Sequence, residues 1–239
     1  IYTQVDNMVG DFPKLKRNKV LVISNKKNTY VQKALNSITN IDIEVSEPPI
    51  VPDINHDLIV IDQVEPDKVI NTMIEQIKDR VERGSSLIIV GQDDLNEIDF
   101  KGILPVSINS VDNSSVPIRN SEALPSIKDL SFGQSGKFLD VGLFNNNTIV
   151  IADTVSNIPV ITFSNYAKGK ILYYGIFDRT NSFRLSTDYP VFWYEIIKKL
   201  TNQNSFAELN KKVGDVISEK DKDIITPGGE KNKNFVKTD

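Results

Sequence analysis

The segment 57–94 constrains the fold most, because two short apolar runs flank one amphipathic stretch. The runs are residues 58–61 and 87–90, and neither of them alternates apolar with polar side chains. Strands that are covered on two faces have this pattern, which is typical of the parallel strands of an α/β sheet. A right-handed crossover through the intervening segment would make the two strands neighbours or near neighbours.

The intervening segment has the pattern of a helix. Pro66 suits the first helical turn, where its missing N–H would have no partner in any case. Gly84 is well placed to end the helix in a left-handed conformation. The residues of the apolar stripe lie four apart: Val69, Met73, Ile77 and Val81. We therefore expect a helix that begins at Pro66 and ends at Gly84.

The same alternation of strand and helix precedes this unit. Residues 20–23 form another buried apolar run, and Thr29 or Asn28 can cap a helix after it. Residues 41–45 alternate apolar and acidic side chains, which predicts a half-exposed strand. The amino-terminal half of the chain therefore predicts a sheet of parallel strands.

The second half predicts a different pairing. Runs 149–152, 159–163 and 170–176 are joined by short links, so we expect them to pair antiparallel. Pro190 then opens a last helix with an apolar face. The long passage 92–138 predicts short edge strands or extended loops over one end of the sheet.

Composition excludes several kinds of site. The 239-residue chain has no cysteine, which rules out a thiol nucleophile, a disulfide framework and thiolate metal ligands. His56 is its only histidine, and we expect it to be a surface or capping residue. With 32 acidic and 28 basic residues there is no basic field for nucleic acid, and no apolar run approaches the ~18 residues of a membrane span.

Polar residues follow three of the predicted strands. In parallel sheets, ligands bind beyond the carboxyl ends of the strands, so these residues form the candidate pocket. One alternative is that they are ordinary solvated loop residues. The candidates are Asp62, Gln63, Gly91, Gln92, Asp93, Asp94 and Asp178.

The order of elements resembles the class I glutamine amidotransferase-like fold, which is a flavodoxin-like α/β sheet. It is most similar to the version found in prokaryotic membrane proteins that also carry von Willebrand A domains. Asp6-Asn7 resembles that family's lead-in, and residues 168–178 with 189–192 resemble its closing strand and Phe-Pro helix. Gly214-Asp215 and residues 226–228 resemble the start of its next β region. The resemblance implies parallel core strands with helices on both faces and an antiparallel extension.

The resemblance also implies a vacated catalytic site. Amidotransferases place a nucleophilic cysteine on the turn after the strand that corresponds to 87–90, and a histidine late in the chain. Here that turn is Gly91-Gln92-Asp93, and no histidine follows His56. A thiolate that attacks an amide needs both groups, so we expect no glutamine hydrolysis, no catalytic residues, no metal and no cofactor.

Two functions remain open from the sequence. The first is a non-catalytic module that recognises a protein partner or a cell-surface polymer, displayed on the extracytoplasmic face of a membrane-anchored parent whose membrane segments lie outside this chain. The second is a carboxylate-based hydrolase or divalent-cation-binding enzyme, in the cytoplasm or outside it. The aromatic residues Tyr166 and Phe183 sit among polar neighbours and could contribute to a recognition surface.

Three segments differ in composition. Residues 1–18 form a polar lead-in, 19–203 form the α/β domain, and 204–239 form a charged tail that is either disordered or the start of a truncated β region. The chain begins at Ile1 without a signal-like apolar run, so we expect it to be a piece of a longer protein.

Overall fold

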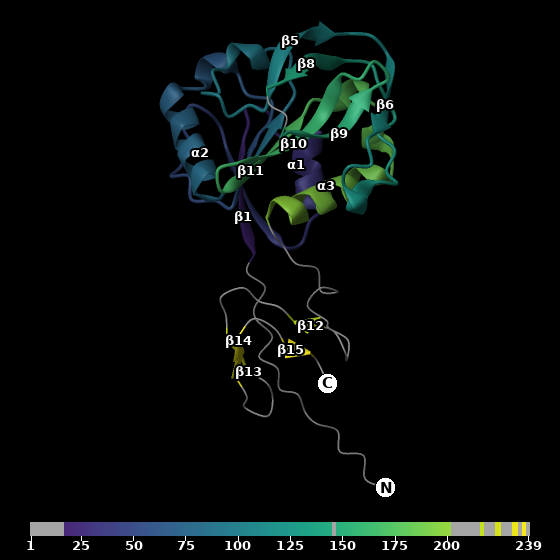
Figure 1. Cartoon of the computed structure of the whole chain (residues 1–239). Helices are drawn as coiled ribbons and strands as arrows, with labels where there is room; N and C mark the ends of the chain where they lie inside the picture. Colours follow the sequence, from purple (N-terminus) through teal and green to yellow (C-terminus); the bar gives the residue numbers. More distant parts are fainter. Residues whose placement is uncertain are drawn as a thin grey trace. The chain divides into compact units, whose positions relative to one another are not determined.

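The computed structural model describes residues 17–144 and 147–201, together with four short strands nearer the carboxyl terminus (Figure 1). The chain divides into two compact units, residues 1–201 and residues 202–239. In the second unit β12 (Val216–Ile217) pairs with β15 (Val236–Lys237), and β13 (Asp223–Ile225) pairs with β14 (Lys231–Lys233). The motifs predicted at Asp6-Asn7, Gly214-Asp215 and 226–228 lie outside the described residues.

Within residues 17–144 and 147–201, nine strands form one mixed sheet in the order β2-β1-β3-β4-β11-β10-β9-β6-β7. Neighbours from β2 to β11 are parallel, and the remaining pairs are antiparallel. The parallel strands are β2 (Ile41–Ser46), β1 (Asn18–Ile23), β3 (Leu58–Ile61), β4 (Ser86–Val90) and β11 (Gly169–Tyr174). The others are β10 (Pro159–Tyr166), β9 (Ile149–Thr154), β6 (Val116–Asn120) and β7 (Gln134–Ser135).

The central unit is β3, α2 and β4, and its two strands are direct parallel neighbours, as predicted. The predicted helix start was wrong. Residues Pro66–Lys68 form a 3-10 turn, and α2 (Asn71–Arg83) begins only after it. Ile70, which directly precedes α2, is 46% exposed. Proline at a first turn suits a 3-10 turn as well as an α-helix, so the signal does not separate the two. Gly84 does end the helix, at a φ of 120°.

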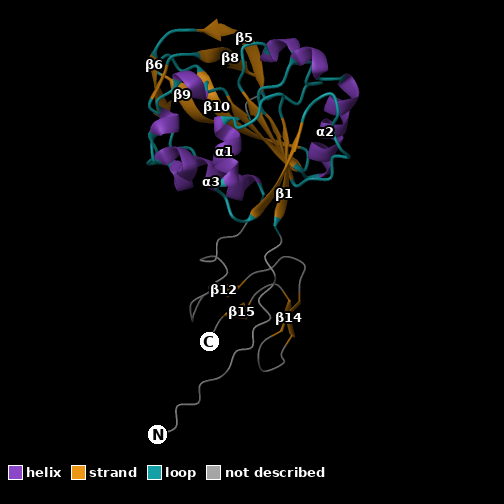
Figure 2. Ribbon diagram, turned by 180° about the vertical axis from the view of Figure 1, so that it is seen from behind, coloured by secondary structure: helices purple, strands orange, loops and turns teal. Residues whose placement is uncertain are grey.

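Two apolar cores cover the parallel strands. One contains α2 and the odd-numbered residues of the central strands, such as Ile59 and Ile89. The other contains α1 (Tyr30–Asn36), α3 (Asp188–Leu200) and the even-numbered residues, such as Val60 and Ile88. Successive side chains of a strand point to opposite faces, so α2 lies across the sheet from α1 and α3 (Figure 2). Thr29 caps α1 by accepting a hydrogen bond from the Gln32 backbone N–H.

The antiparallel half confirms the predicted pairing of β9, β10 and β11. The passage 92–138 forms short strands, which is one of the two alternatives that the sequence left open. Its strand β5 (Val106–Asp112) pairs with β8 (Phe138–Leu143) in a separate two-stranded sheet, and β6 and β7 extend the main sheet. The passage therefore adds strands to the domain, in addition to its loops.

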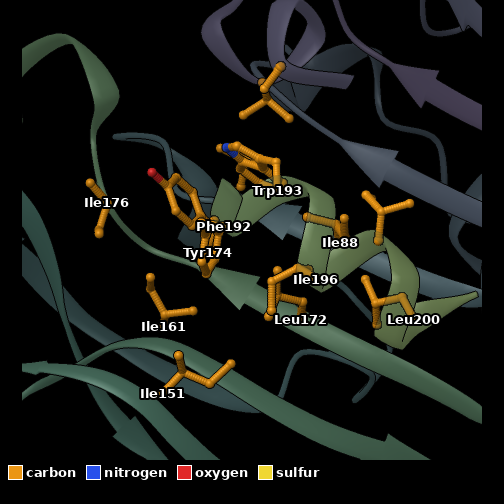
Figure 3. Close-up of a cluster of buried hydrophobic side chains, with 14 of the residues drawn as sticks. Ile88, Ile151, Ile161, Leu172, Tyr174, Ile176, Phe192, Trp193, Ile196 and Leu200 are labelled. Atoms are coloured by element: carbon orange, nitrogen blue, oxygen red, sulfur yellow. The ribbon is translucent and has the colours of Figure 1, made fainter. Parts of the chain in front are cut away.

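Aromatic residues gather between α3 and the sheet. Tyr174 of β11 lies 5.0 Å from Trp193 and 5.8 Å from Phe192, measured between ring centroids (Figure 3). Phe183 belongs to this cluster and is 1% exposed, so the prediction of Phe183 as a recognition residue was wrong. Tyr166 is partly buried and packs against the core on the opposite face. The polar neighbours of Phe183 belong to a tight turn that folds its ring inward.

Candidate functional site

A cavity of about 500 Å³ lies where β1, β3, β4 and β11 end. Its wall is made by the loops that follow these strands, with residues 26–29 after β1 and 176–180 after β11. The carboxyl ends of parallel strands meet at one edge of the sheet, which is where such folds bind ligands. The cavity therefore occupies the position that the sequence predicted for a site.

Six of the seven candidate residues line this cavity. The exception is Asp94, whose carboxylate accepts a hydrogen bond from Gln92 Nε2 at 2.5 Å, at the start of a 3-10 turn. Asp94 turns back onto its own loop and is not among the lining residues. The lining candidates are Asp62, Gln63, Gly91, Gln92, Asp93 and Asp178.

Asp62 is the most buried acid of the cavity, with 1% of its surface exposed. It directly follows β3, and its Oδ2 accepts a hydrogen bond from the Thr29 hydroxyl. Burial raises the pKa of Asp62 to about 6, against the opposing effects of Thr29 and Lys26. Its other oxygen, Oδ1, accepts no hydrogen bond from the residues that the structure describes.

Asp178 also lines the cavity and belongs to the loop that follows β11. The hydroxyls of Tyr174 and Tyr189 donate hydrogen bonds to its two oxygens, both at 2.7 Å. Burial raises the pKa of Asp178 to about 6, although both hydroxyls and the charge of Arg184 oppose the change. The negative charge of Asp178 also raises the pKa of Asp62, so the two carboxylates interact. Such a pair has the chemistry of a general acid and base, or of acceptors for hydroxyl groups.

Gln63 and Gln92 form hydrogen bonds that connect the loops around the cavity. Gln92 is buried and bridges to Val64, accepting from its N–H at 2.9 Å and donating to its carbonyl at 2.6 Å. Gln63 has a φ of 54°, which is uncommon for a residue with a side chain. Its carbonyl accepts a hydrogen bond from the Asn25 N–H at 3.1 Å, which ties the loop after β3 to the loop after β1.

Gly91 begins the turn Gly91-Gln92-Asp93, which the resemblance compares with the nucleophile turn of amidotransferases. Its N–H donates to the Tyr174 carbonyl at 2.7 Å, so the backbones of β4 and β11 are held close together here. A Cβ atom at position 91 would lie 2.9 Å from the Cα of Gly175. A side chain at position 91 would therefore require the backbone of Gly175 to move.

Sequence reasoning missed the cations of this cavity. Lys26, Lys27 and Arg179 line it, are exposed, and form no ion pair with any residue that the structure describes. Lys137 also lines it and pairs with Asp93, with its ammonium group 5.3 Å from the centre of the Phe177 ring. The signal was present in the sequence, because Lys26-Lys27 follows a parallel strand just as the candidate acids do.

His56 lies at the opposite edge of the sheet, before β3. Its side chain is 8% exposed and its Nε2 lies 3.1 Å from a carboxylate oxygen of Glu44, so the predicted surface position was wrong. Its carbonyl accepts a hydrogen bond from the Ser85 hydroxyl at 2.7 Å. Across the described residues, no three His, Cys, Asp or Glu side chains are grouped so that they could hold a metal ion.

Residues 19–196 match the family model for a domain of unknown function, DUF7408. The chain belongs to the DUF7408 family. A search of curated proteins finds no match. None of the helices that the structure describes is long and apolar enough to cross a membrane.

Solved structures share the fold of this DUF7408 domain at low sequence identity. The cytoplasmic protein STM1381 from Salmonella typhimurium LT2 is 16% identical, with a TM-score of 0.64 over 76% of this chain and 99% of that chain. A protein described as ThuA-like from Bacteroides uniformis is 13% identical, with a TM-score of 0.59 over 83% and 97%. Another, from Parabacteroides merdae, is 12% identical, with a TM-score of 0.57 over 78% and 90%. The ThuA-like neighbours have a glutamine amidotransferase-like fold, which this domain shares.

Proposed function

We propose that this DUF7408 domain is a non-catalytic, amidotransferase-like recognition module. It binds a group carried by a protein partner or a cell-surface polymer in the cavity beyond β3, β4 and β11. The observation that carries the proposal is the turn Gly91-Gln92-Asp93, which lines the cavity after β4 and has no thiol or hydroxyl group that could act as the nucleophile. The domain then retains the binding position of the fold without its hydrolytic chemistry.

Two further observations support the loss of hydrolysis. The chain has no cysteine, and its only histidine lies at the amino ends of the strands, across the sheet from the cavity. A nucleophile and its base must lie within hydrogen-bond reach of each other. Neither a cysteine nor a histidine is among the residues that line the cavity.

The test is an assay of ammonia release from glutamine, combined with hydrogen exchange of the intact chain. We expect no ammonia above background from the wild type or from a Gly91→Cys variant. We also expect slower exchange in the loops 24–29 and 91–93 when the chain is mixed with a purified partner or polymer fraction. Ammonia release by the wild type would contradict the proposal, and so would unchanged exchange in these loops with every fraction.

One specific observation favours a second candidate, a carboxylate-based hydrolase. Asp62 and Asp178 line the same cavity, and each has its pKa raised to about 6, a value suited to proton transfer near neutral pH. A panel of chromogenic esters and glycosides tests it. Turnover that Asp62→Asn abolishes would replace the recognition module with an enzyme, whereas the absence of turnover would remove the enzyme.

The location of the parent protein belongs to the same proposal. The resemblance to membrane proteins with von Willebrand A domains favours display on the extracytoplasmic face. The name of one structural neighbour, a cytoplasmic protein, favours the cytoplasmic alternative. Protease treatment of intact cells that express the full-length parent separates them, because only a displayed domain is digested before lysis.

A further inference from the structure

The cavity has two chemically different ends. Its exposed end carries Lys26, Lys27 and Arg179, and its buried end carries Asp62 and the partly buried Asp178. Such a separation predicts a ligand with two unlike parts. One part faces the cations at the exposed end, and the other faces the carboxylates at the buried end.

The exposed end favours an anion. Asp93 neutralises Lys137, but the three exposed cations form no direct ion pair among the described residues, and only Lys26 is close enough to Asp62 to lower its pKa. Lys33 adds a fourth positive charge to the cavity wall, with its ammonium group 5.5 Å from the centre of the Tyr30 ring. Cations that surround a concave site concentrate anionic ligands, and lysine and arginine are common phosphate binders.

The buried end favours hydroxyl groups. Asp62 lines the cavity, and its Oδ1 accepts no hydrogen bond from the described residues, so this oxygen can accept one from a ligand. Each oxygen of Asp178 accepts one tyrosine hydroxyl and has a second lone pair to offer. Ligand hydroxyls supply such donors without adding positive charge, and added positive charge would oppose entry past Lys26 and Lys27.

We propose that the cavity binds a phosphorylated polyol, with the phosphate at Lys26, Lys27 and Arg179 and the hydroxyls at Asp62 and Asp178. This inference rests on the proposed recognition function and names the ligand class for it. A volume of about 500 Å³ lies within the range of small-molecule sites, roughly 300–1,000 Å³. The same chemistry occurs in a free sugar phosphate and in the terminal unit of a polyol-phosphate surface polymer.

Isothermal titration calorimetry of the intact chain tests the assignment. The probes are glycerol 3-phosphate, ribose 5-phosphate, glucose 6-phosphate, poly(glycerol phosphate), glucose and inorganic phosphate. We expect at least one phosphorylated polyol to bind with a Kd below about 1 mM, at least about tenfold tighter than glucose or inorganic phosphate. Tighter binding of the polymer than of the three monomers assigns the surface source, and the reverse assigns the free metabolite.

Two variants test the phosphate contact and the hydroxyl contact separately. Lys26→Gln/Lys27→Gln should weaken the phosphorylated polyol by about tenfold or more. Asp62→Asn should weaken the polyol phosphate and leave inorganic phosphate unchanged or tighter, because a negative charge has been removed. Lys128→Gln/Lys168→Gln is the matched control, since it makes the same charge change at two exposed lysines outside the cavity. Equal weakening by the control would overturn the site.

Failure of this inference can be told apart from failure of the recognition function. Binding of an acidic peptide such as poly-glutamate, with no polyol phosphate binding, overturns the ligand class and leaves a recognition module in place. If no probe binds, and hydrogen exchange in the cavity loops is unchanged by every protein or polymer fraction, both proposals fail.

Discussion

The two ends of the parallel sheet differ in how their polar groups are satisfied. At the amino ends, Lys19 and Asp57 exchange two hydrogen bonds of 2.9 Å, and Ser86 donates to the Leu200 carbonyl at 2.8 Å. At the carboxyl ends, Asp62 is buried with one oxygen unbonded among the described residues. These hydrogen bonds pair the groups named at the first edge, although His56 Nδ1 is buried there without a partner among the described residues. The second edge encloses the cavity of about 500 Å³.

The difference shows which polar groups serve the fold. Partners at the amino ends lie within reach of one another, so their desolvation is compensated. Burial, and to a smaller extent the charge of Asp178, raises the pKa of Asp62 at the carboxyl ends, which destabilises the folded chain at neutral pH. Polar groups that lower the stability of the folded chain are typical of a binding or catalytic site. The amino and carboxyl ends of the sheet should therefore respond differently to substitution.

Gly169→Ala should have the largest effect on stability. A Cβ atom at the start of β11 would collide with the carbonyl oxygens of Val81 and Ser85, and these are backbone atoms that cannot rotate away. We expect the free energy of unfolding to fall by about 3 kcal/mol or more in urea titrations. Gly142→Ala is the control, because its nearest neighbour is the Ser107 side-chain oxygen at 3.0 Å, which can move. If Gly169→Ala lost as little stability as the control, the amino edge would not be closely packed.

Gly91→Ala tests the other edge and should have a smaller effect. The added Cβ atom would lie 2.9 Å from the Cα of Gly175, which is a less severe overlap than the one at Gly169. We expect a loss of about 1 to 3 kcal/mol, measured by the same titration. A loss as large as that of Gly169→Ala would mean that the carboxyl edge is packed as tightly as the amino edge.

The sequence was most informative where local pattern and tertiary position agree. Strands β1, β3 and β4 were predictable because a continuous apolar run has few alternatives to a covered strand. The pairing of β5 was not, because Val106–Asp112 contains serine, asparagine and aspartate and its partner β8 lies far along the chain. The burial of Phe183 was missed because local polarity does not report a turn that folds a ring inward.

The candidate site was partly predictable for the same reason. Acids that directly follow strands reach one edge by topology alone, which places Asp62 and Asp178 in one cavity. Asp94 does not line the cavity because its carboxylate accepts a hydrogen bond from Gln92 within the same loop. No spacing of residues in the sequence predicts this bond. Lys26 and Arg179 also follow parallel strands, but this position alone does not separate a cation that binds a ligand from one that is only solvated.

Asp62→Asn should raise stability at neutral pH. Burial raises the pKa of Asp62 from 3.8 to about 6, so the folded chain binds its proton more tightly than the unfolded chain does. Stability from this group is therefore highest below about pH 4 and falls as the pH rises through 6. Asparagine keeps an oxygen for the Thr29 hydroxyl and removes the charge.

We expect the variant to gain about 2 kcal/mol over wild type at pH 7.5 and little at pH 4, in urea titrations at both values. A similar change at both pH values would show that the effect comes from packing. The carboxyl edge would then not differ from the amino edge in the way proposed.

Glu44→Gln makes the same carboxylate-to-amide change in β2, where the side chain pairs with His56 of the amino edge, and should have the smallest effect. Glu44 pairs with His56 at 3.1 Å, but its side chain is 55% exposed, so water already solvates its charge. We expect a change within about 0.5 kcal/mol at pH 7.5, and polyol-phosphate affinity equal to that of wild type. If Glu44→Gln matched Asp62→Asn in either measurement, loss of a negative charge anywhere on the chain would explain both. If only Asp62→Asn changes stability and affinity, the effect belongs to the cavity.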